Sequence, residues 1–238
     1  MWYVIMCGGD YEFPKPLVKI NGETLVERTI RLLRENTIQD IFISSNNPEY
    51  EKFGVPILKH ENNYIHATNK GSWLNAYYPT NEPCCYLHGD VFFSNDAIKQ
   101  IIEAPVKDAL FICTFDGSDR QYKRDPMNMC GREPFGYKVV NQKKFRKAIN
   151  DLQAMQDDFI IKPFSWHVYR YLNGLPLKQK ATKFTQINNI FNTEGEKLLI
   201  NDYTRDIDVK EQVEILENNL KKWGISWKIY FILGEFAE

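Results

Sequence analysis

Apolar and polar positions alternate along the first fifty residues in the order of a strand, a loop, a helix and a second strand. Residues 2–7 (WYVIMC) are continuously apolar, which is typical of a strand buried on both faces of a parallel sheet. Residues 24–34 place Leu25, Ile30 and Leu33 at roughly helical spacing. Residues 40–45 (DIFISS) predict the next strand. This βαβ order predicts a parallel sheet with a right-handed connection.

The later apolar segments continue the alternation, although the strand–helix step between residues 57 and 78 is less distinct, with a helix expected near residues 73–78. Strands are predicted at residues 83–91, 109–115 and 136–140, and helices at residues 97–103, 145–155 and 209–220. We predict a single α/β domain over residues 1–238, with a mostly parallel central sheet flanked by helices. An inserted lobe is expected at about residues 116–195, followed at residues 221–238 by an apolar tail that packs on the core or forms a homodimer interface.

Composition narrows the class of protein. The 238 residues are 43% apolar and 26% charged with a net charge of −1, so the chain is globular and lacks the basic surplus of a general nucleic-acid binder. Five cysteines without CxxC spacing indicate buried free thiols in a reducing cytosol. No apolar stretch reaches the roughly 20 residues of a membrane span. The short apolar start also lacks the basic region of a signal peptide, so we expect a soluble, cytoplasmic protein.

The loop after the first predicted strand carries the strongest candidate chemistry. Cys7 ends the strand, Gly8 and Gly9 allow a ligand to approach the backbone closely, and their N–H groups suit an anion. Lys15 lies between two prolines and has a cation that can reach a phosphate. The alternative is an ordinary turn followed by a surface lysine. The loop matches neither the Walker A motif nor GxGxxG.

Two acidic motifs are the other candidates. Asp90 follows Gly89 at the end of a buried strand, where ligands of open α/β sheets collect, and its carboxylate suits Mg²⁺. Asp206 and Asp208 precede the last helix, and on an extended segment both project to one face. One of them can complete a metal site with Asp90. The alternatives are a turn-capping aspartate and an acidic helix cap.

In this order, the three motifs resemble the nucleotidyltransferases with a GT-A-like Rossmann fold. The segment YVIMCGGDYEFPKPLVKINGETLVERTIRLL is similar to their opening signature, YLHGDVFF to their central Gly-Asp strand, and DIDVKEQVEIL to their closing Asp motif. The resemblance implies that Lys15, Asp90 and Asp208 are catalytic, with Asp90 and Asp208 as Mg²⁺ ligands and Asp206 as the fallback. It also implies that Cys7, Gly8 and Gly9 lie on the nucleotide.

The opening loop departs from the family pattern, which usually runs Gly-x-Gly-x-Arg with several residues before Pro-Lys. Here the loop is shorter and has no arginine. The missing triphosphate contact is expected from the backbone of residues 10–11, or from Arg120, Lys123 or Arg132.

Within the family, HENNYIHATNKGSWLNAYY is closest to the cytidylyltransferases of choline-phosphate and polyol-phosphate type. That resemblance places Asn62, Asn63 and Ser72 on the pyrimidine and ribose; the alternative is that the two asparagines form a turn. The acceptor phosphate and its substituents are expected in the lobe at residues 116–195. The candidates there are Glu133, Tyr137, Lys162, Trp166 and Arg170.

The resemblance implies Mg²⁺-dependent transfer of a nucleotidyl group. CTP is the expected donor, a phosphorylated sugar, polyol or amino-alcohol is the acceptor, and pyrophosphate is released. The product would serve surface-glycan precursor synthesis. One alternative is a GT-A glycosyltransferase with Asp206-Ile207-Asp208 as its Asp-x-Asp motif, although that motif belongs at mid-chain. The other is a degenerate nucleotide-binding protein without turnover. Release of pyrophosphate distinguishes these classes.

Overall fold

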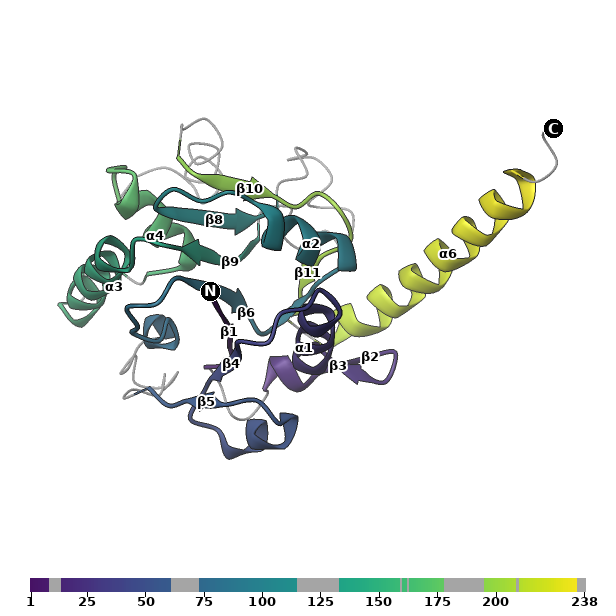
Figure 1. The fold of residues 1–238 in the computed structure, drawn as a ribbon, viewed down its shortest axis with the longest axis horizontal. Coiled ribbons are helices and arrows are strands. Elements are labelled where there is room, and N and C mark those ends of the chain that lie inside the picture. Colours follow the sequence, from purple (N-terminus) through teal and green to yellow (C-terminus); the bar gives the residue numbers. More distant parts are fainter. Residues whose placement is uncertain are drawn as a thin grey trace.

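A seven-stranded sheet forms the centre of the molecule (Figure 1). The structure is a computed structural model that describes residues 1–8, 14–60, 73–114, 133–158, 160–161, 163–177, 195–208 and 210–234. The strands are β1 (Trp2–Met6), β4 (Ile41–Ser44), β5 (Ile57–Leu58), β6 (Cys84–His88), β8 (Ala109–Cys113), β9 (Pro134–Val139) and β10 (Lys197–Leu199). Their order is β10-β8-β9-β6-β1-β4-β5. The predicted α/β class with a mostly parallel sheet is confirmed.

Helices and short ladders complete the described fold. The helices are α1 (Leu25–Glu35), α2 (Asn95–Glu103), α3 (Gln142–Asp157), α4 (Ser165–Leu172) and α6 (Glu211–Gly234). Three 3₁₀ helices are η1 (Lys15–Leu17), η2 (Pro48–Phe53) and η3 (Trp73–Ala76). Two small antiparallel ladders pair β2 (Lys19–Ile20) with β3 (Glu23–Thr24), and β7 (Val91–Phe92) with β11 (Arg205–Asp206).

Alternate residues of β1 enter two separate cores, because successive side chains of a strand point to opposite faces. Tyr3 and Ile5 pack with apolar side chains of α1 and α2, whereas Val4 and Met6 pack with those of η3, α3 and α4. β1 is therefore buried on both faces, which explains its unbroken apolar run. Helices cover both faces of the sheet.

Side-chain caps define where the flanking helices begin and end. Thr24 caps α1 by accepting a hydrogen bond from the Glu27 amide, and the Glu27 carboxylate accepts one from the Thr24 amide in return. Ser94 caps α2, since its side chain accepts a hydrogen bond from the Ala97 amide. The ammonium of Lys138 in β9 is buried against the other end of α2 and donates to the carbonyls of residues 101, 102 and 104 at 3.0, 2.8 and 2.7 Å.

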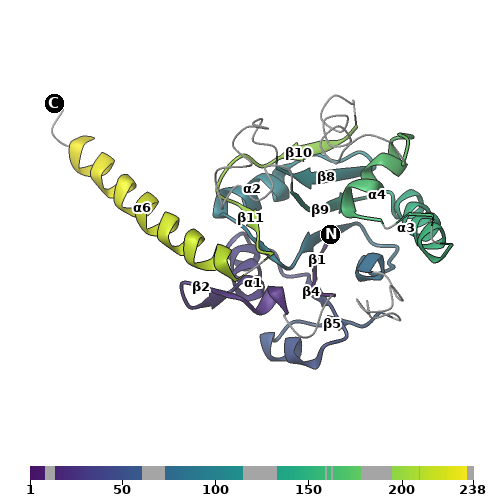
Figure 2. The same ribbon diagram turned by 180° about the vertical axis from the view of Figure 1, so that it is seen from behind.

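The structure differs from the sequence predictions at three elements. β9 runs antiparallel to both β6 and β8, between which it is inserted. Residues 73–76 form one short 3₁₀ helix, because Pro79 follows closely and cannot continue a helical turn. The predicted last helix and apolar tail form one helix, α6, whose ribbon runs away from the sheet in both views (Figures 1 and 2).

Candidate functional site

The carboxyl ends of β1 and β6 form the base of the site. The two strands are parallel neighbours, and the Gly89 amide donates to the Met6 carbonyl at 2.9 Å. A methyl group on Gly89 would lie 2.7 Å from this carbonyl oxygen and 2.8 Å from Cys7 Sγ. Only a glycine fits between these strand ends, so the backbone of Asp90 starts directly beside the end of β1.

The β7–β11 ladder brings the two distant acidic motifs together. Val91 pairs with Asp206, and the Ile207 amide donates to the Asp90 carbonyl at 3.0 Å. The chain before β11 is tied to the start of α2, because the Ser94 amide donates to Thr204 Oγ1 at 2.9 Å. Residues that are more than a hundred positions apart in the sequence therefore share one edge of the sheet.

Lys15 lies among these carboxylates. Its Nζ is 2.5 Å from Asp208 Oδ1 and 3.8 Å from Asp90 Oδ2. Burial alone would lower the pKa of Lys15, but Asp90, the hydrogen bond to Asp208 and the charge of Asp206 together raise it above its usual value. Lys15 is therefore a fully charged ammonium at neutral pH. All three residues with predicted catalytic roles are brought together, and those roles stay predictions.

Asp206 is the most deeply placed acid of the site. Its Oδ1 is buried and has no hydrogen-bond partner among the described residues. Burial raises the pKa of Asp206 well above the ordinary range, and the neighbouring charges of Asp90, Glu133 and Asp208 raise it further, while Lys15 lowers it. Glu133, an acceptor-side candidate from the sequence, is thereby placed in electrostatic contact with the acidic cluster.

The donor set fits a hard divalent cation. Asp90, Asp206 and Asp208 offer carboxylate oxygens, which Mg²⁺ prefers, and the orphaned Oδ1 of Asp206 is a ligand atom without a partner. The site is not preassembled: within the described ranges, no group of three His, Cys, Asp or Glu side chains is arranged to hold a metal ion. The ammonium of Lys15 contacts one of the two carboxylate oxygens of Asp208.

Three acceptor-side candidates lie on the α3/α4 side of the sheet. Tyr137 is fully buried and donates to the Ser165 carbonyl at 2.7 Å. Arg170 is also buried, and its Nε donates to the Pro176 carbonyl at 2.5 Å. Trp166 is half-buried and stacks on the rings of its neighbours Phe164 and His167. Tyr137 and Arg170 thus have structural contacts, whereas Trp166 and the half-exposed Phe164 present aromatic surface.

The remaining candidates divide between described and undescribed residues. Gly8 is described, and a methyl group there would lie 3.1 Å from the Ala76 side chain. The side chain of Cys7 is buried as a free thiol, as are Cys84, Cys85 and Cys113. The predicted residues outside the described ranges are Gly9, Asn62, Asn63, Ser72, Lys162, Arg120, Lys123 and Arg132, together with the backbone of residues 10–11.

Two residues beside the site were missed by the sequence reasoning. Gln212 is buried, and its Oε1 accepts from the Asp208 amide at 2.5 Å, which fixes the turn that carries the Asp208 carboxylate. His88 lies two residues before Asp90, with Nε2 at 3.3 Å from Tyr77 Oη. Burial lowers the pKa of His88, although Asp90 and a hydrogen bond to the Pro134 backbone oppose this effect. The spacing Asp-x-x-x-Gln at a helix start was the available signal for Gln212.

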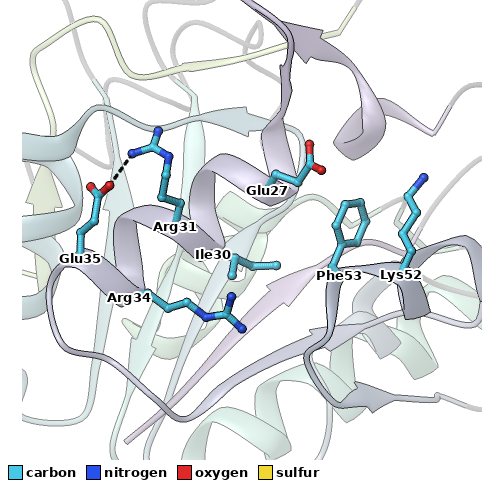
Figure 3. A pocket seen from close by; sticks show the side chains of 7 residues that line it. All are labelled: Glu27, Ile30, Arg31, Arg34, Glu35, Lys52 and Phe53. Atoms are coloured by element: carbon cyan, nitrogen blue, oxygen red, sulfur yellow. Dashed lines mark hydrogen bonds and ion pairs between the residues drawn. The ribbon is translucent and has the colours of Figure 1, made fainter.

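A separate hollow of about 350 Å³ lies on the outer side of α1 and η2 (Figure 3). Arg31 on its wall is paired with Glu35 at 2.9 Å. Its lining includes none of the candidate site residues, and consists of Glu27, Ile30, Arg31, Arg34, Glu35, Lys52 and Phe53. The hollow is a charged surface feature apart from the acidic cluster.

Comparison with solved structures identifies the fold as that of cytidylyltransferases. The 4-diphosphocytidyl-2C-methyl-D-erythritol synthase from Anaerococcus prevotii matches with a TM-score of 0.52 at 14% identity, over 92% of this chain and 95% of that one. The 2-C-methyl-D-erythritol 4-phosphate cytidylyltransferase from Thermus thermophilus gives the same score and identity, over 92% and 98%. No curated protein sequence matches the chain.

The family follows from the sequence itself. Residues 5–177 match the model of the MobA-like NTP transferase domain. The match spans more than half of the chain, so the protein belongs to the MobA-like NTP transferase family and is a nucleotidyltransferase. The predicted resemblance is confirmed. Over the part of the chain that the structure describes, no helix combines the length and apolar character that a membrane crossing requires.

Proposed function

We propose that this protein transfers a cytidylyl group from CTP to a phosphorylated sugar, polyol or amino-alcohol and releases pyrophosphate. The observation that carries the proposal is the convergence of Lys15, Asp90 and Asp208 at the carboxyl ends of parallel strands. The activities for which the two structural relatives are named support cytidine as the base and a polyol phosphate as one acceptor class. Surface-glycan precursor synthesis in the cytoplasm is the setting that we propose for this reaction.

The chemistry is an in-line displacement at the α-phosphorus of the triphosphate. An acceptor phosphate oxygen forms the new P–O bond, the bond to the bridging oxygen of the β-phosphate breaks, and pyrophosphate carries away the electron pair. Phosphate oxygens are already nucleophilic at neutral pH, so the site needs no general base. Catalysis then consists of positioning and charge neutralisation.

Each residue has a defined task in this proposal. The Gly8 backbone lets the triphosphate lie against the end of β1. Lys15 neutralises the charge that develops on the α-phosphate. Asp90 and Asp208 would hold Mg²⁺, with Asp206 as the fallback ligand, and Mg²⁺ would supply Lewis-acid neutralisation of the phosphate oxygens.

Thermal unfolding with each of CTP, UTP, dTTP, ATP and GTP, with and without Mg²⁺, tests donor binding first. A ligand at a hundred times its Kd stabilises the folded state by about 2.7 kcal/mol. We expect a shift with CTP that Mg²⁺ enlarges. Pyrophosphate release with a panel of phosphorylated acceptors then tests turnover.

Matched carboxamide variants locate the chemistry. We expect Asp90→Asn and Asp208→Asn to lower the rate of pyrophosphate release by about 100-fold or more. Asp40→Asn offers a control, because the exposed Asp40 lies at the amino end of β4, whereas the acidic cluster lies at the carboxyl ends of the parallel strands. Equal rates in all three variants would contradict the proposed site. Two other outcomes would support the alternative functions. Release of a nucleoside diphosphate from a nucleotide sugar would indicate a glycosyltransferase. Binding of a triphosphate without any product would indicate a nucleotide-binding protein that has no turnover.

A further inference from the structure

The ammonium of Lys15 occupies the position of a cation within the acidic cluster. It contacts Asp208 Oδ1 at 2.5 Å and approaches Asp90 Oδ2 at 3.8 Å, so one positive group serves both predicted metal ligands. Glu133 lies close enough to this cluster to raise the pKa of Asp206, whose buried side chain favours the protonated form. Lys15 is the cation that neutralises these carboxylates in the described structure.

The contact with Lys15 weakens coordination of Mg²⁺ by Asp208. Mg²⁺ requires carboxylate oxygens at about 2.0–2.1 Å and keeps several water molecules around it in octahedral geometry. The ammonium of Lys15 already holds Asp208 Oδ1 at 2.5 Å, so an ion bound to this carboxylate would lie close to a second positive charge. The two cations repel each other at such a separation. Lys15 and the divalent ion therefore compete for the negative charge of Asp208.

The local backbone permits this exchange through the side chain alone. Lys15 begins η1 and is flanked by Pro14 and Pro16, whose rings restrict the main chain. Its side chain is one-third exposed, and the four-carbon stem rotates freely where solvent allows. The ammonium can therefore swing from the carboxylates toward a phosphate while the loop stays in place.

We propose that Lys15 is a placeholder cation, which neutralises Asp90 and Asp208 in the unliganded protein and competes with the divalent ion for Asp208. The inference rests on the proposed function, because the triphosphate is the group that would draw Lys15 away. Metal alone then binds weakly, and metal and nucleotide strengthen each other's binding. By linkage, the factor is the same in both directions.

The competition between Lys15 and the divalent ion is tested by titrating the protein with Mn²⁺ in the absence of nucleotide. The EPR signal of the free ion measures how much Mn²⁺ is bound. We expect Lys15→Met to bind Mn²⁺ about tenfold more tightly than the wild type, within the usual range of site-to-site coupling. Lys15→Arg keeps the cation and should bind as weakly as the wild type. Lys19→Met removes an exposed lysine of the neighbouring strand β2 and should change nothing. Adding Asp208→Asn to Lys15→Met should abolish the gain.

The proposal would be overturned if Lys15→Met bound Mn²⁺ no more tightly than the wild type. It would also be overturned if none of the variants bound Mn²⁺. Acetic anhydride labelling of the wild type gives a second measurement that needs no variant. Mn²⁺ should raise the labelling rate of Lys15 several-fold, because the ion separates Lys15 from its carboxylate partners. The labelling rate of Lys19 should stay the same. An unchanged rate at Lys15 would overturn the proposal. Neither experiment contains nucleotide, so failure of pyrophosphate release would count against the proposed function alone.

Discussion

Replacing Gly89 with alanine probes the packing that supports Asp90. The added methyl group would lie 2.7 Å from the Met6 carbonyl oxygen, 2.8 Å from Cys7 Sγ and 3.1 Å from Pro16 Cγ. Ordinary contacts of a methyl carbon begin near 3.4 Å, so all three atoms are too close. The Met6 carbonyl cannot retreat easily, since it accepts the hydrogen bond from the amide of residue 89 itself.

The magnitude follows from this overlap. Overpacking of a well-packed core costs about 1–3 kcal/mol. For a domain of this size, each kcal/mol lowers Tm by about 2–4 °C, so Gly89→Ala should lower Tm by about 2–12 °C. The strain also pushes Asp90 and Lys15 apart, because Gly89 immediately precedes Asp90 and contacts Pro16, the neighbour of Lys15. A displacement on the order of 1 Å can cost a factor of about 100 in rate, so kcat/KM should fall at least tenfold.

Thermal unfolding and pyrophosphate release measure the two effects. Gly8→Ala is the graded comparison, since its methyl group would meet two side-chain atoms, Ala76 Cβ at 3.1 Å and His60 Nε2 at 3.2 Å, and neither belongs to the backbone. We expect a smaller loss of Tm there. If Gly89→Ala unfolds within 1 °C of the wild type, or Gly8→Ala loses more stability, the steric argument is refuted.

Three further predictions concern the rest of the chain. Lys138→Met leaves three carbonyls at the end of α2 without their donor, so it should lower the free energy of unfolding in urea by about 2–4 kcal/mol. As a control, Lys143→Met replaces an exposed lysine and should change this free energy by less than about 0.5 kcal/mol. The raised pKa of Asp206 means that the folded state keeps a proton that the unfolded chain releases, so this residue costs stability as the pH rises above about 4. Asp206→Asn should therefore stabilise the protein at pH 8 and have little effect near pH 4; a pH-independent change in thermal unfolding would contradict this. Deleting residues 223–238, which contain the far end of α6, tests the two alternatives for the apolar tail. If the tail forms a homodimer interface, the deletion should convert a dimer to a monomer in size-exclusion chromatography with light scattering, and an unchanged dimer mass would place the interface elsewhere.

Local pattern was sufficient to predict most of the elements near the start of the chain. The unbroken apolar run of β1 and the spacing within α1 both predicted their observed structures, because each element buries a face that its own residues define. Asp90 could be singled out because it directly follows a recognisable strand end, and Lys15 because it lies between two prolines in the loop after the first strand.

Long-range pairing could not be read in the same way. The mostly apolar residues of β9 suit a parallel or an antiparallel neighbour equally, so its insertion between β6 and β8 depends on the connections around it. Tyr137 had the chemistry of a substrate contact, yet the face of β9 that carries it turns toward α3 and α4. The sequence likewise could not show the different surroundings of Asp206 and Asp208: the Oδ1 of Asp206, in the β7–β11 ladder, is buried, whereas the Asp208 side chain is exposed.

The β7–β11 ladder also sets the order of events during biosynthesis. Asp90 leaves the ribosome 115 residues before Arg205, so at about 5–20 residues per second its partner strand follows on the order of ten seconds later. During that interval the emerging sheet can bury β1 and β6, but the edge of β7 has no strand to pair with, and Lys15 has only half of its carboxylate partners. A nascent chain that ends before β11 consequently has the sheet edge but neither the ladder nor the contact between Lys15 and Asp208.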